Sequence, residues 1–266
     1  MTTIKEQFEK NGFYGPVVFL TNKENKELLQ QIVNTDNELD LMNSDYRCKS
    51  NVLFPWIDKL SRHPTIIAHV KEILGNNIHC WDTLLWIKHP KTDKFVSYHQ
   101  DGTYWNFTPK TSGLTVWVTP TGATREMGCI KYEVGSHCNQ VEHIDIKNRD
   151  NLLMRGQTAT KHSDKFVHVE CPEGSFLMHS PYIVHGSEQN NTNDVRIAIG
   201  FIYAASDAKP IVNYSPESTI MVNGTDHYNY MIHDNVPTGD WDTDIKHWRV
   251  AYDRQHDNYY KLQQKL

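Results

Sequence analysis

The stretch YIVHGSEQNNTNDVRIAIGFIY, residues 182–203, contains two runs of β-branched and aromatic residues around a polar middle. The middle, NNTND, has the composition of a turn, and the flanking runs have that of strands. We therefore interpret the stretch as a β-hairpin. With the turn centred near Asn191, Ser187 would lie opposite Arg196. His185 would share their face, because side chains alternate along a strand.

Short segments of the same composition continue outward from this stretch, over about residues 78–203, separated by Gly, Pro, Asn or Asp. Many short strands with regular turns are typical of a β-sandwich or jelly roll rather than of βαβ units. Residues 23–33, 64–75 and 242–264 instead have the spacing or the end signals of helices. We expect one domain over residues 1–266, mainly β, with a jelly-roll core and helical N- and C-terminal flanks.

Composition excludes several classes of function. The net charge is −5 with no basic cluster, which argues against nucleic-acid and anionic-membrane binding. The five cysteines are scattered without a C-x-x-C pair, so neither a disulfide framework nor a cysteine zinc site is expected. No window approaches the ~18 apolar residues of a membrane span. We expect a cytoplasmic protein.

The segment FVSYHQD, residues 95–101, contains a candidate metal site. If it is one strand, His99 and Asp101 share a face, about 7 Å apart along the backbone. A lone H-x-D is weak, because the chain has 15 histidines. His185 would complete a 2-His-1-carboxylate set, which is typical of non-haem Fe(II) oxygenases. The rival third ligands are His179, His137, His162 and His168.

These motifs together resemble the phytanoyl-CoA dioxygenase family of Fe(II)/2-oxoglutarate oxygenases. The resemblance lies in the order H-x-D, a distal histidine, and an arginine eleven residues later. It covers roughly residues 78–203, including MGCIKYEVGSH at 127–137. A weaker match is FEKNGFYGPVVFL at 8–20. It implies a double-stranded β-helix (cupin-like jelly-roll) core.

The resemblance also assigns roles. It implies that Fe(II) is held by His99, Asp101 and His185, and that the distal carboxylate of 2-oxoglutarate is held by Arg196 and Ser187. Trp117 would line the co-substrate pocket. Related halogenases have Ala or Gly at the position of Asp101. The resemblance therefore implies hydroxylation of a small molecule with O2, releasing succinate and CO2.

Several alternatives stay open. The same cofactors support desaturation, cyclisation or bond cleavage, and the same triad would suit a zinc hydrolase or isomerase. A metal-binding jelly roll without turnover is a further alternative. The substrate is expected to be a small polar or cationic molecule, and Arg155 could reach it from a connecting loop. Lys88 is a candidate anion contact but is expected to be a surface charge. The expected substrate contacts are Tyr98, Tyr104, Trp105, Trp81 and Asp82.

Overall fold

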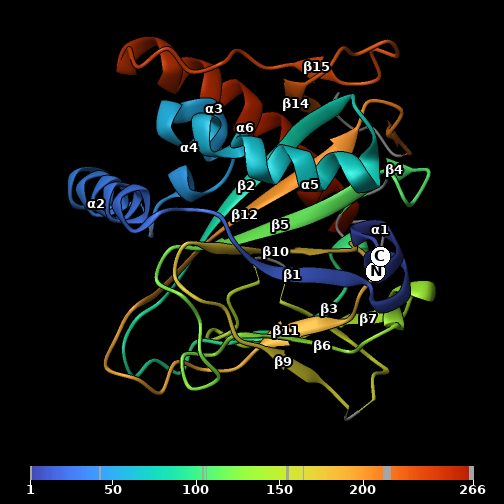
Figure 1. Cartoon of the computed structure of the whole chain (residues 1–266). Coiled ribbons are helices and arrows are strands. Elements are labelled where there is room, and N and C mark those ends of the chain that lie inside the picture. Colours follow the sequence, from blue (N-terminus) through green and yellow to red (C-terminus); the bar gives the residue numbers. More distant parts are fainter. Residues whose placement is uncertain are drawn as a thin grey trace. The chain divides into compact units, whose positions relative to one another are not determined.

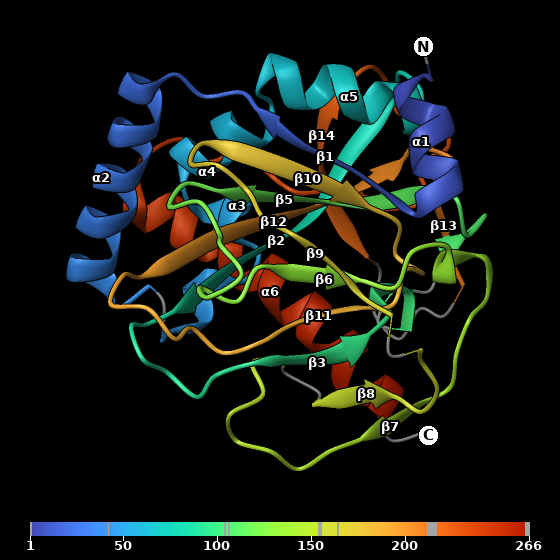
Figure 2. The same cartoon turned by 60° about the horizontal axis from the view of Figure 1, so that its bottom comes forward.

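The protein is described by a computed structural model that covers residues 2–41, 43–103, 105, 107–153, 156–163, 165–211 and 217–263. Figures 1 and 2 show the helices and strands of the chain in two views. By its internal contacts the chain divides into two compact units. The first unit contains residues 1–30, 86–105 and 117–199, and the second contains 31–85, 106–116 and 200–266. Three strands run through both: β2 (Ile78–Lys88), β5 (Gly113–Thr119) and β12 (Arg196–Ala205).

The first unit begins with α1 (Ile4–Asn11) and β1 (Phe13–Val18). Thr3 and Glu6 form a capping box at the start of α1, and Gly12 ends it with a φ of 85°, which only glycine adopts readily. Strand β1 then pairs antiparallel with β10 (Ser175–His179), with Phe13 opposite His179. This pairing begins a seven-stranded sheet of order β1-β10-β5-β12-β2-β14-β15.

A second sheet in the first unit positions the candidate ligands. Its order is β3-β11-β6-β9, formed by Val96–His99, His185–Ser187, Ile130–Tyr132 and Val167–Val169. A separate pair is formed by β7 (His143–Asp145) and β8 (Gln157–Ala159). In Figure 1 the four-stranded sheet forms a layer facing β1 and β10. The expectation of a mainly β protein with flanking helices is confirmed.

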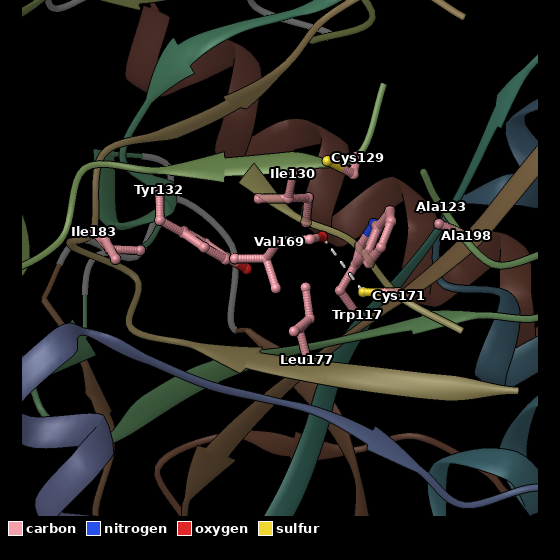
Figure 3. Close-up of a cluster of buried hydrophobic side chains, with 10 residues drawn as sticks. All are labelled: Trp117, Ala123, Cys129, Ile130, Tyr132, Val169, Cys171, Leu177, Ile183 and Ala198. Atoms are coloured by element: carbon pink, nitrogen blue, oxygen red, sulfur yellow. Dashed lines mark hydrogen bonds between the residues drawn. The ribbon is translucent and has the colours of Figure 1, made fainter. Parts of the chain in front are cut away.

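An apolar cluster fills the space between these layers. Figure 3 shows side chains of β6, including Ile130 and Tyr132, pointing toward Leu177 on β10. Trp117 of β5 belongs to the same cluster and is 5% exposed. Because protein interiors are close-packed, this cluster fixes the positions of polar side chains at its edge.

The hairpin interpretation of residues 182–203 is wrong. Strand β11 pairs with β3 and β6, whereas β12 lies between β5 and β2 in the other sheet. The polar segment NNTND therefore connects two sheets and is not a tight turn between paired strands. Composition identified both strands, but it carries no signal for a strand's partner.

The second unit contains most of the helical structure. Helix α2 (Asn22–Leu39) begins in the first unit and ends in the second. The helices α3 (Ser50–Leu53), α4 (Pro55–Ser61), α5 (Pro64–Leu74) and α6 (Trp241–Gln263) follow. Short strands complete this unit: β4 (Phe107–Thr108), β13 (Lys209–Pro210), β14 (Ser218–Asn223) and β15 (Ile232–His233). Among the described residues, no helix has both the length and the apolar character needed to cross a membrane.

Candidate active site

Two histidines lie side by side on neighbouring strands. His99 is the last residue of β3 and His185 is the first of β11, and the two are register partners in the antiparallel pair. Their ring centroids are 4.2 Å apart. Both residues are buried, with 3% and 6% exposure. Cross-strand pairing therefore brings together two imidazoles that are 86 positions apart in the sequence.

Asp101 joins this pair from a turn, not from the strand. Strand β3 ends at His99, and a 3-10 turn, Asp101–Thr103, begins two residues later. The turn places Oδ1 of Asp101 3.2 Å from Nε2 of His99 and 3.7 Å from Nε2 of His185. Gly102 allows this path, because a Cβ there would lie 2.6 Å from the ring of Tyr182. The predicted alternation of His99 and Asp101 on one strand is thus incorrect, although the two side chains do meet.

The backbone fixes which nitrogen of each ring faces Asp101. Nδ1 of His99 lies 2.9 Å from the carbonyl oxygen of Ser97, and Nδ1 of His185 lies 3.0 Å from that of Ile183. A carbonyl can only accept, so each Nδ1 carries a proton, and in the neutral ring each Nε2 presents a lone pair. Lone pairs on Nε2 face a carboxylate oxygen at close range only when a cation lies between them. The donor set therefore fits a divalent metal ion.

The protonation states of His185 and Asp101 also favour metal binding. Burial, and the nearby His99, hold the pKa of His185 well below its usual value, so this imidazole is neutral. Burial alone would raise the pKa of Asp101, but the surrounding histidines, including the hydrogen bond from His179, hold it well below its usual value. An ionised carboxylate beside the neutral imidazole of His185 is suited to metal binding.

His179, the closest rival ligand, contacts the other carboxylate oxygen. Its Nε2 lies 3.1 Å from Oδ2 of Asp101, and its Nδ1 lies 2.8 Å from the hydroxyl of Tyr132. Burial raises the pKa of Tyr132 well above its usual value, so the phenol stays protonated. Its O–H therefore donates a hydrogen bond to Nδ1 of His179. The Nε2 proton of His179 then points at Asp101. His179 therefore orients Asp101 and leaves Oδ1 for the histidine pair.

Two basic side chains are buried in the same unit. Arg196, the first residue of β12, is 2% exposed, and its guanidinium lies over the ring of Trp117 with 5.3 Å to the centroid. Lys88, the last residue of β2, is fully buried. Its Nζ donates to Oγ of Ser187 at 2.6 Å, and also to the carbonyl oxygen of Glu188. The expectation that Lys88 is a surface charge is wrong.

Neither of these basic side chains has an anionic partner within the described part of the chain. Nε of Arg196 is buried without a hydrogen-bond partner there, and neither residue forms a salt bridge there. Burial lowers the pKa of Arg196 to about 10. Burial, and then repulsion by Arg196, lower the pKa of Lys88 to about 6. Buried charges are normally paired, so these two side chains are suited to bind an anionic ligand.

The family follows from a comparison with known proteins. The family model described as phytanoyl-CoA dioxygenase (PhyH) matches residues 8–198, which is more than half of the chain. The chain belongs to the phytanoyl-CoA dioxygenase family. This family consists of Fe(II)/2-oxoglutarate dioxygenases, so the expected family and cofactor class are confirmed.

Individual relatives of this PhyH-family chain are distant. A probable phytanoyl-CoA dioxygenase of Caenorhabditis elegans is 29% identical over 168 residues, which cover 60% of this chain and 54% of the relative. The chain spans about half the length of the curated relatives that it matches.

Solved structures confirm the fold. The apo form of ThoJ, a non-heme monooxygenase, matches with a TM-score of 0.89 at 23% identity, covering 99% of this chain and 100% of ThoJ. SnoN, an epimerase solved with Fe3+, alpha ketoglutarate and nogalamycin RO, matches with a TM-score of 0.67 at 17% identity, covering 90% and 95% of the two chains. The double-stranded β-helix core expected for the PhyH family is therefore confirmed.

The expected substrate contacts of this PhyH-family chain do not gather in one place. Tyr98 precedes His99 on β3 and therefore points to the opposite face, where it stacks on Phe166 at 4.2 Å. It lines a cavity of about 430 Å³ away from the histidine pair. Trp105 is buried with 5% exposure. Tyr104 and Arg155 lie outside the described residues.

Trp81 and Asp82 belong to the second unit and are engaged there. Nε1 of Trp81 donates to Glu217 at 3.0 Å. Oδ1 of Asp82 accepts from the backbone N–H groups of Lys49 and Thr83, and Oδ2 accepts from Gln255 at 2.7 Å. Both carboxylate oxygens of Asp82 thus already have protein donors.

Sequence reasoning undervalued two residues of this PhyH-family site. His179 ends the fully buried strand SFLMH, and Lys88 ends the largely buried strand IHCWDTLLWIK. A polar residue at the end of such an apolar strand is the signal that could have identified both. Burial of a His or Lys is costly unless the residue has a partner, so each required one.

Proposed function

We propose that this protein hydroxylates a C–H bond of a small-molecule metabolite, using Fe(II), 2-oxoglutarate and O2 and releasing succinate and CO2. One observation carries the proposal: one ligand atom from each of His99, Asp101 and His185 lies within 4.8 Å of the others. The buried basic side chains of Arg196 and Lys88 in the same unit support it, because 2-oxoglutarate is a dicarboxylate.

In this proposal His99, Asp101 and His185 hold the iron. When bound, the iron with 2-oxoglutarate supplies the activation of O2 and the oxidising equivalents for the C–H bond. His179 and Tyr132 hold the Asp101 carboxylate in one orientation. The protein's contribution is to keep the ligand set fixed and its remaining face free for co-substrate.

Arg196, Ser187 and Lys88 would bind the distal carboxylate of 2-oxoglutarate. A guanidinium provides two parallel N–H donors, and the ammonium and hydroxyl add single donors. The Arg196 guanidinium lies over the ring of Trp117, and both residues are buried. In such a buried environment a charge-assisted hydrogen bond is stronger than it would be in water.

The outcome of the oxidation is proposed as hydroxylation. The carboxylate of Asp101 argues against halogenation, since the related halogenases lack it. SnoN is named as an epimerase, so the same fold accommodates other outcomes. Desaturation, cyclisation or bond cleavage would be distinguished by the mass of the product, since only hydroxylation adds one oxygen atom.

We also propose that the chain acts as one catalytic domain on a small polar or cationic substrate in the cytosol. The family match over residues 8–198 includes segments of both units, which supports one domain. The five cysteines are all free thiols, which suits a reducing compartment. The net charge of −5 gives no support to nucleic-acid or anionic-membrane partners.

The decisive experiment is anaerobic and needs no substrate. Protein with Fe(II) is titrated with 2-oxoglutarate, and the weak visible absorption of the Fe(II)–2-oxoglutarate chelate is followed. We expect the band in the wild type and in His162→Ala, an exposed histidine outside the site. We expect no band in His99→Ala. If the iron-loaded wild type gives no band, the oxygenase function is wrong, and the non-catalytic metal-binding alternative takes its place.

A further inference from the structure

A second group of metal-ligating side chains lies in the second unit, built from three short pieces of chain. His79 lies on β2, opposite Met221 of β14. His233 ends β15, which pairs in parallel with β14, with Thr219 opposite His233. Asp226 lies in the connection between β14 and β15. Strand β14 is therefore flanked on both sides by a strand that carries a histidine.

The ligand atoms of this group converge. Oδ2 of Asp226 lies 2.9 Å from Nε2 of His233 and 3.7 Å from Nε2 of His79. One ligand atom from each of the three residues lies within 4.8 Å of the others. Metal–nitrogen and metal–oxygen distances of about 2.1 Å in a tetrahedral site separate ligand atoms by about 3.4 Å. The two observed separations bracket that value.

The surroundings of His79 indicate that an ion binds here. It is fully buried, and both of its ring nitrogens lack a hydrogen-bond partner among the described residues. Burial lowers the pKa of His79 to about 4, so the ring is neutral and offers a lone pair. A buried imidazole without hydrogen bonds is costly, and a metal–nitrogen bond would remove that cost.

Asp226 is oriented as a metal-binding carboxylate. Its Oδ1 accepts hydrogen bonds from the backbone N–H groups of Tyr228 and Asn229, at 2.9 and 3.1 Å. This leaves Oδ2 directed at the two histidines. Burial opposes ionisation, but the hydrogen bonds from His233 and from the backbone hold the pKa of Asp226 below its usual value. Such supporting contacts around a ligand are typical of metal sites.

The group is also accessible. The side chain of Asp226 is 2% exposed, whereas that of His233 is 45% exposed. An ion can therefore reach the two inner ligands from solvent past His233. Two imidazoles and one carboxylate favour a borderline transition ion over Mg²⁺ or Ca²⁺, which prefer oxygen ligands.

We propose that His79, Asp226 and His233 form a second metal site, separate from the proposed iron centre, that binds a divalent transition ion such as Zn²⁺. The site links β2, β15 and the connection between β14 and β15. That connection has eight residues, 224–231, whereas parallel strands usually need a dozen or more. A metal crosslink would stabilise this short connection.

The test uses the full chain with the proposed iron site removed by His99→Ala and Asp101→Ala. After dialysis against Zn²⁺, we expect one zinc per chain in this background. Adding His233→Ala should lose that zinc, or weaken its binding more than tenfold. Adding His227→Ala, a neighbouring exposed histidine, should change nothing. Because the background lacks the iron ligands, the result is independent of the proposed oxygenase activity.

A second readout is thermal unfolding. Zn²⁺ should raise the Tm of the background and of its His227→Ala version, since a ligand that binds the folded state stabilises it. It should leave the Tm of the His233→Ala version unchanged. His233 is half exposed, so its removal leaves the core intact. Absence of zinc from the background, or zinc retained after both His233→Ala and Asp226→Asn, would overturn the proposal.

Discussion

Nε2 of His179 lies 3.1 Å from Oδ2 of Asp101, while Oδ1 of the same carboxylate faces His99 and His185. The two oxygens of Asp101 thus have different neighbours. Because the hydroxyl of Tyr132 donates to Nδ1 of His179, the orientation of His179 is itself fixed. The carboxylate is therefore preoriented before any ion binds, which reduces the entropy lost on binding.

His179→Ala should weaken iron binding without removing a ligand. We expect about 10- to 100-fold more Fe(II) to be needed for half of the chelate absorption, as for other supporting contacts of metal ligands. Tyr132→Phe should have a smaller effect in the same direction, because His179 keeps its contact with Asp101. His162→Ala is the matched control. If His179→Ala lowers the Tm but leaves the iron requirement unchanged, His179 has only a structural role.

Asp101→Ala removes the proposed carboxylate ligand, and 2-oxoglutarate-dependent succinate formation should disappear. The substitution also leaves the Nε2 atoms of His99 and His185 without an anion, so iron binding should weaken. Asp145→Ala, at an exposed position of β7, should retain activity. Succinate formation at the wild-type rate in Asp101→Ala would exclude Asp101 from the site.

The sequence predicted which residues belong to this candidate site better than it predicted the strands and turns that position them. The strand content near His99 and His185 followed from local patterns. The choice of His185 as the third ligand rested on its spacing to Arg196 and on the family resemblance. Asp101 was assigned to a strand, because periodicity does not show where β3 ends. The partner of β11 was also missed, because strand pairing depends on packing of residues distant in sequence. Lys88 was underestimated for the same reason, since its burial depends on both sheets.

Asp82→Ala should affect stability and not co-substrate binding. Asp82 is buried, and its removal leaves the donors of Lys49, Thr83 and Gln255 unpaired. Each buried unpaired group costs about 1–3 kcal/mol, so we expect a loss of at least about 3 kcal/mol in the free energy of unfolding. Urea unfolding measures this. Wild-type stability combined with a raised KM for substrate would instead support the expected substrate contact.

Arg196→Leu should weaken 2-oxoglutarate binding by up to a few kcal/mol, because it removes a buried bidentate donor. The dissociation constant is measured from the chelate absorption at saturating iron. Arg196→Lys should be intermediate, since it keeps the charge but loses the paired geometry. Arg125→Leu, an exposed arginine, is the control. An unchanged dissociation constant in Arg196→Leu would remove Arg196 from this role.

Lys88 makes co-substrate binding depend on pH. Its pKa is about 6 in the free protein, where burial and Arg196 oppose the charged form. A bound carboxylate favours the ammonium, so binding raises this pKa and takes up a proton at pH values above about 6. Affinity for 2-oxoglutarate should therefore fall as pH rises from that value.

Calorimetry in buffers of different ionisation enthalpy measures this proton uptake directly. Lys88→Met should bind 2-oxoglutarate more weakly and without proton uptake. Lys94→Met, which changes a partly exposed lysine paired with Asp150, should keep both properties of the wild type. A binding enthalpy that is independent of the buffer in the wild type would show that Lys88 does not change its charge. Lys88 would then contribute only its hydrogen bonds to Ser187 and Glu188, and co-substrate affinity would not depend on pH through Lys88.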